Sequence, residues 1–435
     1  MRLRPLVCPP APGTLCCRAG RRYSEGTATG FVTIQSTATA TDDEESISTQ
    51  VVEIVPLSVR NLTFAGDLNV LQDNGAQYSG VDWQNNSSGS GDVDASDLGD
   101  RRFPIAYVRN SVVNVTALKM KTSAPPGYDI VLHGQGTPSL AGVPHYYGLV
   151  AKTASDSLEL VGPAMLAVKQ DRTAFVHLPN KVRFINPYTI DWELWFGGDS
   201  YADAGTTDNR FYVLLANTAR PLYETACDIS CKAANQYTDP AGVVGRIWAE
   251  FTDLDVRRKA MDGFNVADGD GTGVRMGYWR PPKVTIPQTL VDMLTHPTGN
   301  GSCVAWSELL IACIDAHTLG AVQSVILPDL SIHPLADGFL VKHWTFGTPG
   351  SGDFPYVIGE SAIDGEGAPG QDRDNPPGGF ESHYVVKYGG LIYDPSYGLG
   401  PLSELQHEDA AIDGFYDVDL NAREDGPGPE LVYDP

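Results

Sequence analysis

The spacing of the apolar residues changes once along this 435-residue chain, near residue 209. Before that point, apolar and β-branched residues alternate with polar ones in short runs at 31–40, 50–55, 112–118 and 189–196. Stretches rich in Gly, Ser, Asn and Asp separate these runs. Short strands with turn residues between them, and no helical period, are typical of an all-β sandwich. We therefore predict a β-sandwich module at 31–205.

From residue 209 the apolar residues recur with a helical period. Residues 209–251 predict two or three helices interrupted by Pro221 and Pro240, and a short helix follows at 287–295. The strongest helix signal lies at 302–319, where apolar residues occupy nearly every side, so this helix should be buried. Strand-like runs follow at 322–327, 339–346, 382–388 and 391–394. Helices followed by an antiparallel sheet indicate an α+β domain, which we place at 206–403.

Three segments lack the pattern of a packed element. Residues 1–30 begin with a basic, proline-interrupted stretch that makes a poor signal peptide, and we predict a disordered leader there. Residues 347–381 are rich in Gly, Pro and Asp, which predicts a long surface loop, here an insertion. Residues 404–435 hold ten acidic residues and one basic residue, which predicts an acidic disordered tail.

The charge balance excludes several kinds of partner. The chain has 30 Lys and Arg against 54 Asp and Glu, a net charge of −24. Affinity for nucleic acid and for anionic lipid rests on basic side chains, so neither is expected as a partner. No stretch approaches the length of apolar sequence that a membrane span requires. The seven cysteines include no CxxC pair, and we expect neither a disulfide framework nor a zinc site.

Cys303 stands at the start of the predicted buried helix, after the run Gly-Asn-Gly-Ser. Unpaired backbone N–H groups and the positive end of the helix dipole lie at such a position. Both favour the thiolate, which is the nucleophilic form of cysteine. The alternative is that Cys303 is a small apolar residue of the core.

A histidine and an aspartate are predicted to meet on one hairpin. Gly389-Gly390 separates two strand-like runs and is typical of a two-residue turn. If that turn pairs residue 388 with 391, His383 and Asp394 become diagonal neighbours on one face of the hairpin. An aspartate that accepts from one imidazole nitrogen leaves the other free to take a proton from a thiol. The alternative is that both are ordinary solvated residues of an exposed hairpin.

Other residues of the chain are candidates for the base or for stabilising an oxyanion. His343 is the competing base, with Asp353 as its only obvious carboxylate. Trp279 is the candidate to stabilise an oxyanion, whereas Trp306, one turn below Cys303, is expected in the core. The remaining residues are expected to be core, rim or turn residues: Cys227, Cys231, Cys313, His317 and the acidic turns at 92–97 and 268–273. Of the glycosylation sequons, at Asn61, Asn85, Asn86, Asn114 and Asn300, a glycan on Asn300 would block access to Cys303.

The ordered motifs G-S-C-V-A-W at 301–306, S-H-Y-V-V at 382–386 and I-Y-D-P-S at 392–396 resemble those of the transglutaminase-like superfamily of papain-type cysteine enzymes. The resemblance covers about 210–403. It implies a nucleophile at Cys303, a base at His383 and an orienting carboxylate at Asp394, with no cofactor or metal. The chain departs from the family in the 80 residues between Cys303 and His383 and in having no firmly placed oxyanion-stabilising aromatic residue.

These observations predict a cysteine-dependent hydrolase or acyltransferase that acts on amide bonds of a protein or peptide through a thioester. The sequence does not choose between water and an amine as the final acceptor. The alternatives are a non-catalytic binding or cell-surface protein with a degenerate domain of this kind, and a purely structural surface protein.

Overall fold

The computed structural model of this chain describes part of its 435 residues. It describes the backbone at 16–24, 27–39, 45–54, 57–65, 67–78, 82–84, 101–122, 147–152, 164–165, 175–196, 199–258, 274–279, 286–317, 322–327, 336–341, 344, 346, 348–351, 353–358, 368–426 and 429–433. Side chains are described mainly from residue 209 onward, and before it at 64, 67–78, 82, 103–111 and 178–186. The architecture is mixed α+β, with several mostly antiparallel sheets and five helices in this described part.

A three-stranded antiparallel sheet lies nearest the N-terminus, in the order β1-β2-β3. Its strands are β1 (Cys16–Ser24), β2 (Thr27–Thr39) and β3 (Glu45–Ile54). Strands therefore occupy 16–24 and 27–30, where we expected a disordered leader. The prolines that suggested disorder all precede residue 13, and 16–24 contains none.

Two five-stranded sheets follow, in the orders β11-β10-β13-β14-β8 and β12-β9-β4-β6-β7. The strands are β4 (Leu57–Ala65), β6 (Trp83–Gln84), β7 (Arg101–Arg102), β8 (Pro104–Val108), β9 (Val112–Thr122), β10 (Tyr147–Lys152), β11 (Ala164–Met165), β12 (Phe175–His177), β13 (Arg183–Phe196) and β14 (Asp199–Leu214). β4 and β14 contact each other across the two sheets. The strands expected at 31–40, 50–55, 112–118 and 189–196 are confirmed as β2, β3, β9 and β13.

Strand β14 crosses the predicted boundary at residue 205. Its last residues pair in parallel with β8, from Arg210 opposite Pro104 to Leu214 opposite Val108. We predicted helix from residue 209, which is wrong for 209–214. Phe211, Tyr212, Val213 and Leu214 are all buried, so both faces of the strand are covered and the apolar residues do not alternate.

Five helices are described: α1 (Glu224–Ala233), α2 (Pro240–Thr252), α3 (Leu290–Thr295), α4 (Cys303–Asp315) and α6 (Glu404–Ala411). Pro240 is the first residue of α2, where its missing N–H costs nothing, and the Asp239 side chain caps the helix by accepting from Gly242 N. α3 is capped in the same way by Thr289. α4 confirms the predicted buried helix, since most of its residues are buried.

The C-terminal half contains two further sheets, in the orders β20-β25-β26-β27 and β22-β23-β29-β28-β21-β24. Their strands are β20 (Val322–Leu327), β21 (Gly338–Val341), β22 (Thr348–Ser351), β23 (Phe354–Val357), β24 (Gly379–Phe380), β25 (His383–Tyr388), β26 (Leu391–Asp394), β27 (Leu399–Leu402), β28 (Ile412–Tyr416) and β29 (Asn421–Glu424). Three small pairs join other segments: β15 (Leu222–Tyr223) with β5 (Val70–Leu71), β16 (Arg257–Arg258) with β17 (Val274–Arg275), and β18 (Gly277–Tyr278) with β19 (Asn300–Gly301).

Two segments expected to be irregular carry regular structure. Within 347–381, β22 and β23 form a hairpin that extends the six-stranded sheet. Within 404–435, α6, β28 and β29 are formed, so this segment is not the disordered acidic tail that we predicted. Its acidic residues are interleaved with Ile412, Phe415 and Ala422, which are buried. The prediction rested on the average composition of the segment, in which these few apolar positions have little weight.

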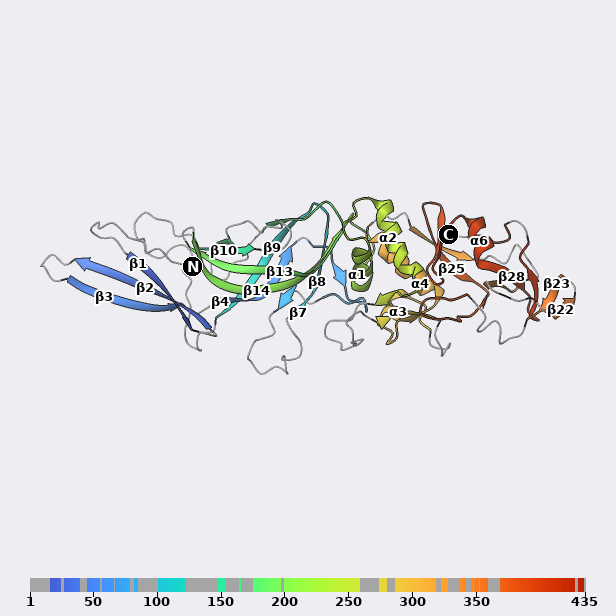
Figure 1. The fold of residues 1–435 in the computed structure, drawn as a ribbon, viewed down its shortest axis with the longest axis horizontal. Helices are drawn as coiled ribbons and strands as arrows, with labels where there is room; N and C mark the ends of the chain where they lie inside the picture. The colour runs from blue at the N-terminus through green and yellow to red at the C-terminus, as the bar shows by residue number, and fades with distance from the viewer. Residues whose placement is uncertain are drawn as a thin grey trace.

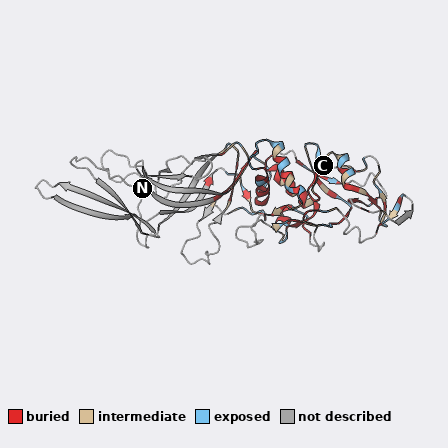
Figure 2. Ribbon diagram, in the orientation of Figure 1, coloured by how far each residue is buried: buried red, intermediate tan, exposed pale blue. Residues whose placement is uncertain are grey.

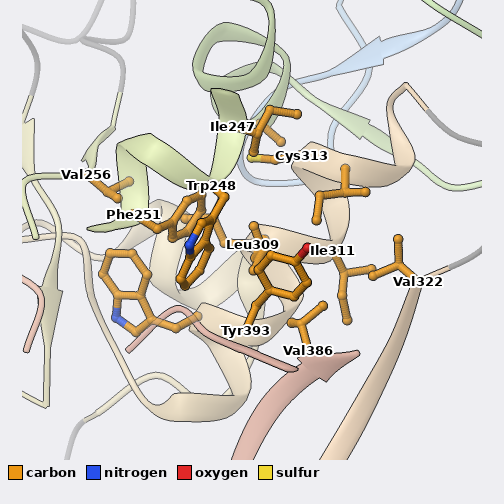
Figure 3. Close-up of a cluster of buried hydrophobic side chains, with 14 of the residues drawn as sticks. Ile247, Trp248, Phe251, Val256, Leu309, Ile311, Cys313, Val322, Val386 and Tyr393 are labelled. Carbon is orange, nitrogen blue, oxygen red and sulfur yellow. The ribbon is translucent and has the colours of Figure 1, made fainter. Parts of the chain in front are cut away.

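One hydrophobic core joins the helices to the strands on both sides of them. It contains Val70, Ala106 and Tyr212 from the N-terminal strands together with Trp306 and Leu309 of α4. Figure 3 shows its centre, where Trp248 and Phe251 of α2 lie beside Leu309 of α4 and Tyr393 of β26. In Figure 1 the molecule is elongated, and in Figure 2 α1, α2 and α4 carry many of the residues described as buried. Among the described helices, none is long and apolar enough to cross a membrane.

Candidate active site

Cys303 is the first residue of α4 and is 4% exposed. Ser302 is the N-cap, and its own N–H donates to Pro287 O at 2.9 Å. The residues before it pair in parallel with β18, Asn300 opposite Gly277 and Gly301 opposite Tyr278. The thiol is therefore fixed at the positive end of a helix, between a strand pair and the buried body of α4.

His383 and Asp394 meet on the predicted hairpin. Tyr388 pairs with Leu391 and Val386 with Tyr393 around Gly389-Gly390, as the turn predicts. The two glycines have φ values of +60° and +80°, which side chains with a Cβ adopt at a cost. His383 Nε2 and Asp394 Oδ2 lie 2.8 Å apart, and each side chain is 2% exposed. The pairing predicted from the sequence is thus present, but it is buried rather than solvated.

The hairpin is tied to α4 one turn below Cys303. The Ser307 hydroxyl donates to the carbonyl of Tyr384 at 2.9 Å, and Tyr384 directly follows His383. The imidazole contacts two aromatic rings, with its centroid 5.4 Å from that of Phe380 and 5.7 Å from that of Tyr397. The ring turns Nε2 toward Asp394. Nδ1 is buried and makes no hydrogen bond of ordinary geometry among the described residues, so it remains for the Cys303 thiol.

Electrostatics favour a charged pair at this site. Burial lowers the pKa of His383, but Asp394 and then Cys303 outweigh burial and raise that pKa to about 10. Burial alone would raise the pKa of Asp394, but His383 and then His407 hold it well below its ordinary range. Asp394 is therefore a carboxylate at neutral pH and His383 an imidazolium. A buried imidazolium beside a thiol is the arrangement that stabilises a thiolate.

Asp394 has partners that the sequence analysis did not find. Its Oδ1 accepts from Ser396 N at 3.0 Å. His407 of α6, which is fully buried, places its Nε2 3.9 Å from Asp394 Oδ2. The Tyr433 hydroxyl lies 3.0 Å from His407 Nδ1. Both residues belong to the segment that we expected to be disordered, which is why they were missed.

Two aromatic residues flank the nucleophile's strand pair. Trp279 is half-buried, its N–H donates to Gly301 O at 3.0 Å, and its ring centroid lies 6.0 Å from that of Phe380. Its φ of +52° is uncommon for a tryptophan and sets the direction of its side chain. Tyr278 is fully buried, and burial, then Tyr397 and Cys303, raise its pKa well above the ordinary value. Tyr278 therefore keeps a neutral hydroxyl near the thiol.

A strap of partly buried residues, 368–378, lies against this region. The Gln371 side chain donates to the carbonyls of Phe251 and Pro395 at 2.8 Å and 2.9 Å, and Gln371 O accepts from Tyr278 N. Arg373 donates to the carbonyl of Trp279. Part of the predicted surface loop is thus packed between the nucleophile's strand pair and the Asp394 strand.

The other candidates fall outside this arrangement. His343 lies outside the described residues, as does the turn at 268–273, and Asp353 is exposed. Trp306 is fully buried and donates to Gly277 O, which confirms the core interpretation. Cys227, Cys231, Cys313 and His317 are buried together, with Cys231 Sγ 4.0 Å from His317 Nε2. Burial lowers the pKa of His317 to about 3, so this histidine is neutral.

Among the described residues, no group of three or more His, Cys, Asp or Glu side chains is placed to hold a metal ion. Asn300, the sequon nearest the nucleophile, is 4% exposed in the folded chain. No family model, curated protein or solved structure matches this chain.

Proposed function

We propose that this protein is a cysteine-dependent enzyme of the transglutaminase-like, papain-type class that acts on amide bonds of a protein or peptide. The observation that carries the proposal is the buried contact of 2.8 Å between His383 and Asp394 beside the helix-starting Cys303. If His383 and Asp394 were ordinary solvated residues of an exposed hairpin, both side chains would be exposed, whereas each is 2% exposed. We further propose that the two five-stranded sheets, which contact each other through β4 and β14, form a β-sandwich that precedes the enzyme fold.

The proposed reaction uses the two nitrogens of the His383 ring differently: Nε2 faces Asp394, and Nδ1 exchanges the proton with Cys303. Cys303 Sγ attacks the carbonyl carbon of the amide, with its proton held on His383 Nδ1. The imidazolium then donates this proton to the departing amine nitrogen, the C–N bond breaks, and an acyl thioester remains on Cys303. Water or a second amine, deprotonated by His383, attacks the thioester and frees the thiol. Asp394 keeps the ring oriented and offsets its positive charge throughout.

The oxyanion formed in each attack needs hydrogen-bond donors. The backbone N–H groups of the first turn of α4 are the candidate donors, since the intrahelical hydrogen bonds begin with that from Trp306 N to Ser302 O. Trp279 remains the proposed side-chain contributor, because its backbone is hydrogen-bonded to Gly301, two residues before the nucleophile.

The decisive experiment measures alkylation of single cysteines by iodoacetamide between pH 4 and pH 10, read by peptide mass spectrometry. Cys303 should label at pH 6 at least about tenfold faster than Cys313, which is fully buried in the same helix. His383→Ala should abolish the advantage at acidic pH, and His343→Ala should leave it unchanged. Equal labelling of Cys303 and Cys313 would overturn the proposal and favour a non-catalytic binding protein.

Turnover is tested with a panel of peptide amides, with and without an added primary amine. Cys303→Ser should abolish hydrolysis and transfer while leaving the unfolding midpoint in urea within the error of the wild type, because serine nearly matches cysteine in size. Release of acid alone identifies a hydrolase, and incorporation of the amine identifies an acyltransferase.

A further inference from the structure

The contacts of His407 set it apart from an ordinary core histidine. It is completely buried in α6, yet neither ring nitrogen is bound to the backbone of its own helix in the described contacts. Nδ1 lies 3.0 Å from the Tyr433 hydroxyl, and Nε2 has no hydrogen bond of ordinary geometry. The charged group nearest to Nε2 is the Asp394 carboxylate, at 3.9 Å.

The neighbouring carboxylate favours one tautomer of His407. A carboxylate only accepts, so the favourable tautomer places the ring proton on Nε2, toward Asp394. Nδ1 then accepts, and the Tyr433 hydroxyl is the donor in reach. Burial, then Glu408, Glu404 and Asp394, raise the pKa of Tyr433 well above its ordinary value, so that hydroxyl keeps its proton. The carbonyl of Glu404, at 2.9 Å, is the competing acceptor for it.

We propose that His407 is a positioning residue of the active site, which shares the Asp394 carboxylate with His383 and so limits how strongly Asp394 holds the imidazolium. This inference rests on the proposed function, because it assigns His407 a part in tuning the Cys303–His383 pair. Asp394 Oδ1 is held by Ser396 N, while Oδ2 faces both histidines. Each N–H directed at Oδ2 takes part of its charge, so the two rings compete for one oxygen.

Tyr433 reaches this site from residues 429–433, which are themselves anchored on α6. The carboxylate of Glu408, the next residue after His407, accepts from the N–H groups of Glu430 and Leu431. The ring of Tyr433 also packs edge-on against that of His407, with centroids 5.8 Å apart. The 429–433 segment thus holds the Tyr433 hydroxyl against Nδ1 of a residue whose Nε2 faces the proposed triad.

The test compares the pH profile of Cys303 alkylation in the full chain for the wild type, His407→Phe and His407→Gln. In His407→Phe, Asp394 loses a competing donor, so the step at which the imidazolium gives up its proton should move upward by about half a pH unit. His407→Gln restores an N–H group near Nε2 and should return the step to its wild-type position. Tyr433→Phe removes only the hydroxyl and should produce a smaller shift in the same direction.

The outcomes separate this inference from the proposed function. An unmoved step in His407→Phe and Tyr433→Phe, with a wild-type Cys303 that is reactive and depends on His383, would overturn the role of His407 alone. A uniform fall of the rate at every pH, not rescued by Gln, would show a merely structural residue and also overturn it. An unreactive wild-type Cys303 would overturn the proposed function itself. Should His407→Phe fail to fold, the Gln and Tyr433 variants decide the question by the same step.

Discussion

At the scale of single residues, the site is defined by one carboxylate with unusually many neighbours. Asp394 contacts Ser396 N, His383 and His407, and it is 2% exposed. Its charge is what keeps His383 protonated against the effect of burial. The same charge couples protonation to stability, because His383 binds its proton more tightly in the folded chain. That stabilisation is complete below pH 6.5 and is lost as the pH rises through about 10.

Asp394→Asn should therefore reduce the reactivity of Cys303 more at acidic pH than at alkaline pH. Without the carboxylate, burial lowers the pKa of His383 and the imidazolium is lost at neutral pH, so alkylation at pH 6 should fall by about tenfold or more. As the pH rises through about 10, His383 of the wild type loses its proton as well, so the rates should converge. Asp353→Asn, at an exposed position, is the matched control. A fall of equal size at both pH values would contradict this explanation.

Some residues of this site can be predicted from the sequence and others cannot. Gly389-Gly390 fixes the hairpin register, and the register places His383 beside Asp394. Cys303 is readable because a glycine-rich run precedes a long apolar helix. The places of His407 and Tyr433 in the site cannot be predicted, since only the tertiary fold brings them to Asp394 and their local sequence is acidic. The parallel pairing of 277–278 with 300–301 is likewise set by packing and not by any local pattern.

At the scale of elements, the hairpin turn and the α6–β29 region carry most of the geometry. Gly389 and Gly390 have positive φ values, and nothing lies within 4 Å of a Cβ built on either of them. Any cost of substitution there comes from the backbone and not from a clash. The α6–β29 region instead concentrates negative charge: Glu408, Asp425 and Glu430 lie together, with Arg423 2.8 Å from Glu430.

Gly390→Val should lower the free energy of unfolding by about 1–2 kcal/mol, because a β-branched residue adopts positive φ only under strain. Urea denaturation measures this cost. Gly245→Ala is the control: it lies in α2 with open space around its Cβ, and it should be neutral or stabilising. An unchanged stability in Gly390→Val would mean that the turn changes its conformation freely, and that the register of β25 and β26 does not depend on it.

The acidic cluster should make the protein less stable as the pH rises from 4 to 7. Burial, followed by Glu408 and Glu430, raises the pKa of Asp425 to about 7, so the folded chain binds this proton more tightly than the unfolded chain. The stabilising effect is complete below the ordinary value of 3.8 and is lost as the pH rises through about 7. Asp425→Asn should flatten the dependence of the unfolding midpoint on pH between 5 and 8. An unaltered slope would place the titrating group elsewhere, with Asp82 as the next candidate because burial raises its pKa to about 7.

At the scale of the whole molecule, buried polar contacts and a shared hydrophobic core join the N-terminal strands to the helical region. The Asp73 carboxylate accepts from Thr225 N at 3.0 Å and from the Thr225 hydroxyl at 2.7 Å, in the first turn of α1. Glu224 is bound by Arg210 of β14 and by Tyr78. β14 also carries Tyr212 and Leu214 into the same core as α4. In Figure 1, α1 lies next to the end of these strands.

A chain that begins at residue 205 should therefore fail to fold, contrary to the boundary expected from the sequence. It would lack β8, the partner of β14, and would leave Glu224 and Thr225 without Tyr78 and Asp73. Circular dichroism and size-exclusion chromatography of 205–435 should show an aggregated or unfolded chain. In the full chain, Asp73→Ala should cost about 1–3 kcal/mol, because it leaves buried donors without an acceptor. A soluble, cooperatively unfolding 205–435 fragment would restore the boundary near 205.

The parallel pairing of β8 with β14 has a kinetic consequence. Residues 104–108 must find residues 210–214 across about a hundred intervening positions, and α1 is the first helix after the strand thus fixed. Closing so long a loop costs conformational entropy before the strands form any stabilising contact. Chains of this topology therefore fold slowly. Refolding should therefore show the helical signal and the recovery of Cys303 reactivity rising together in one late phase. The active site would then be among the last parts of the molecule to form.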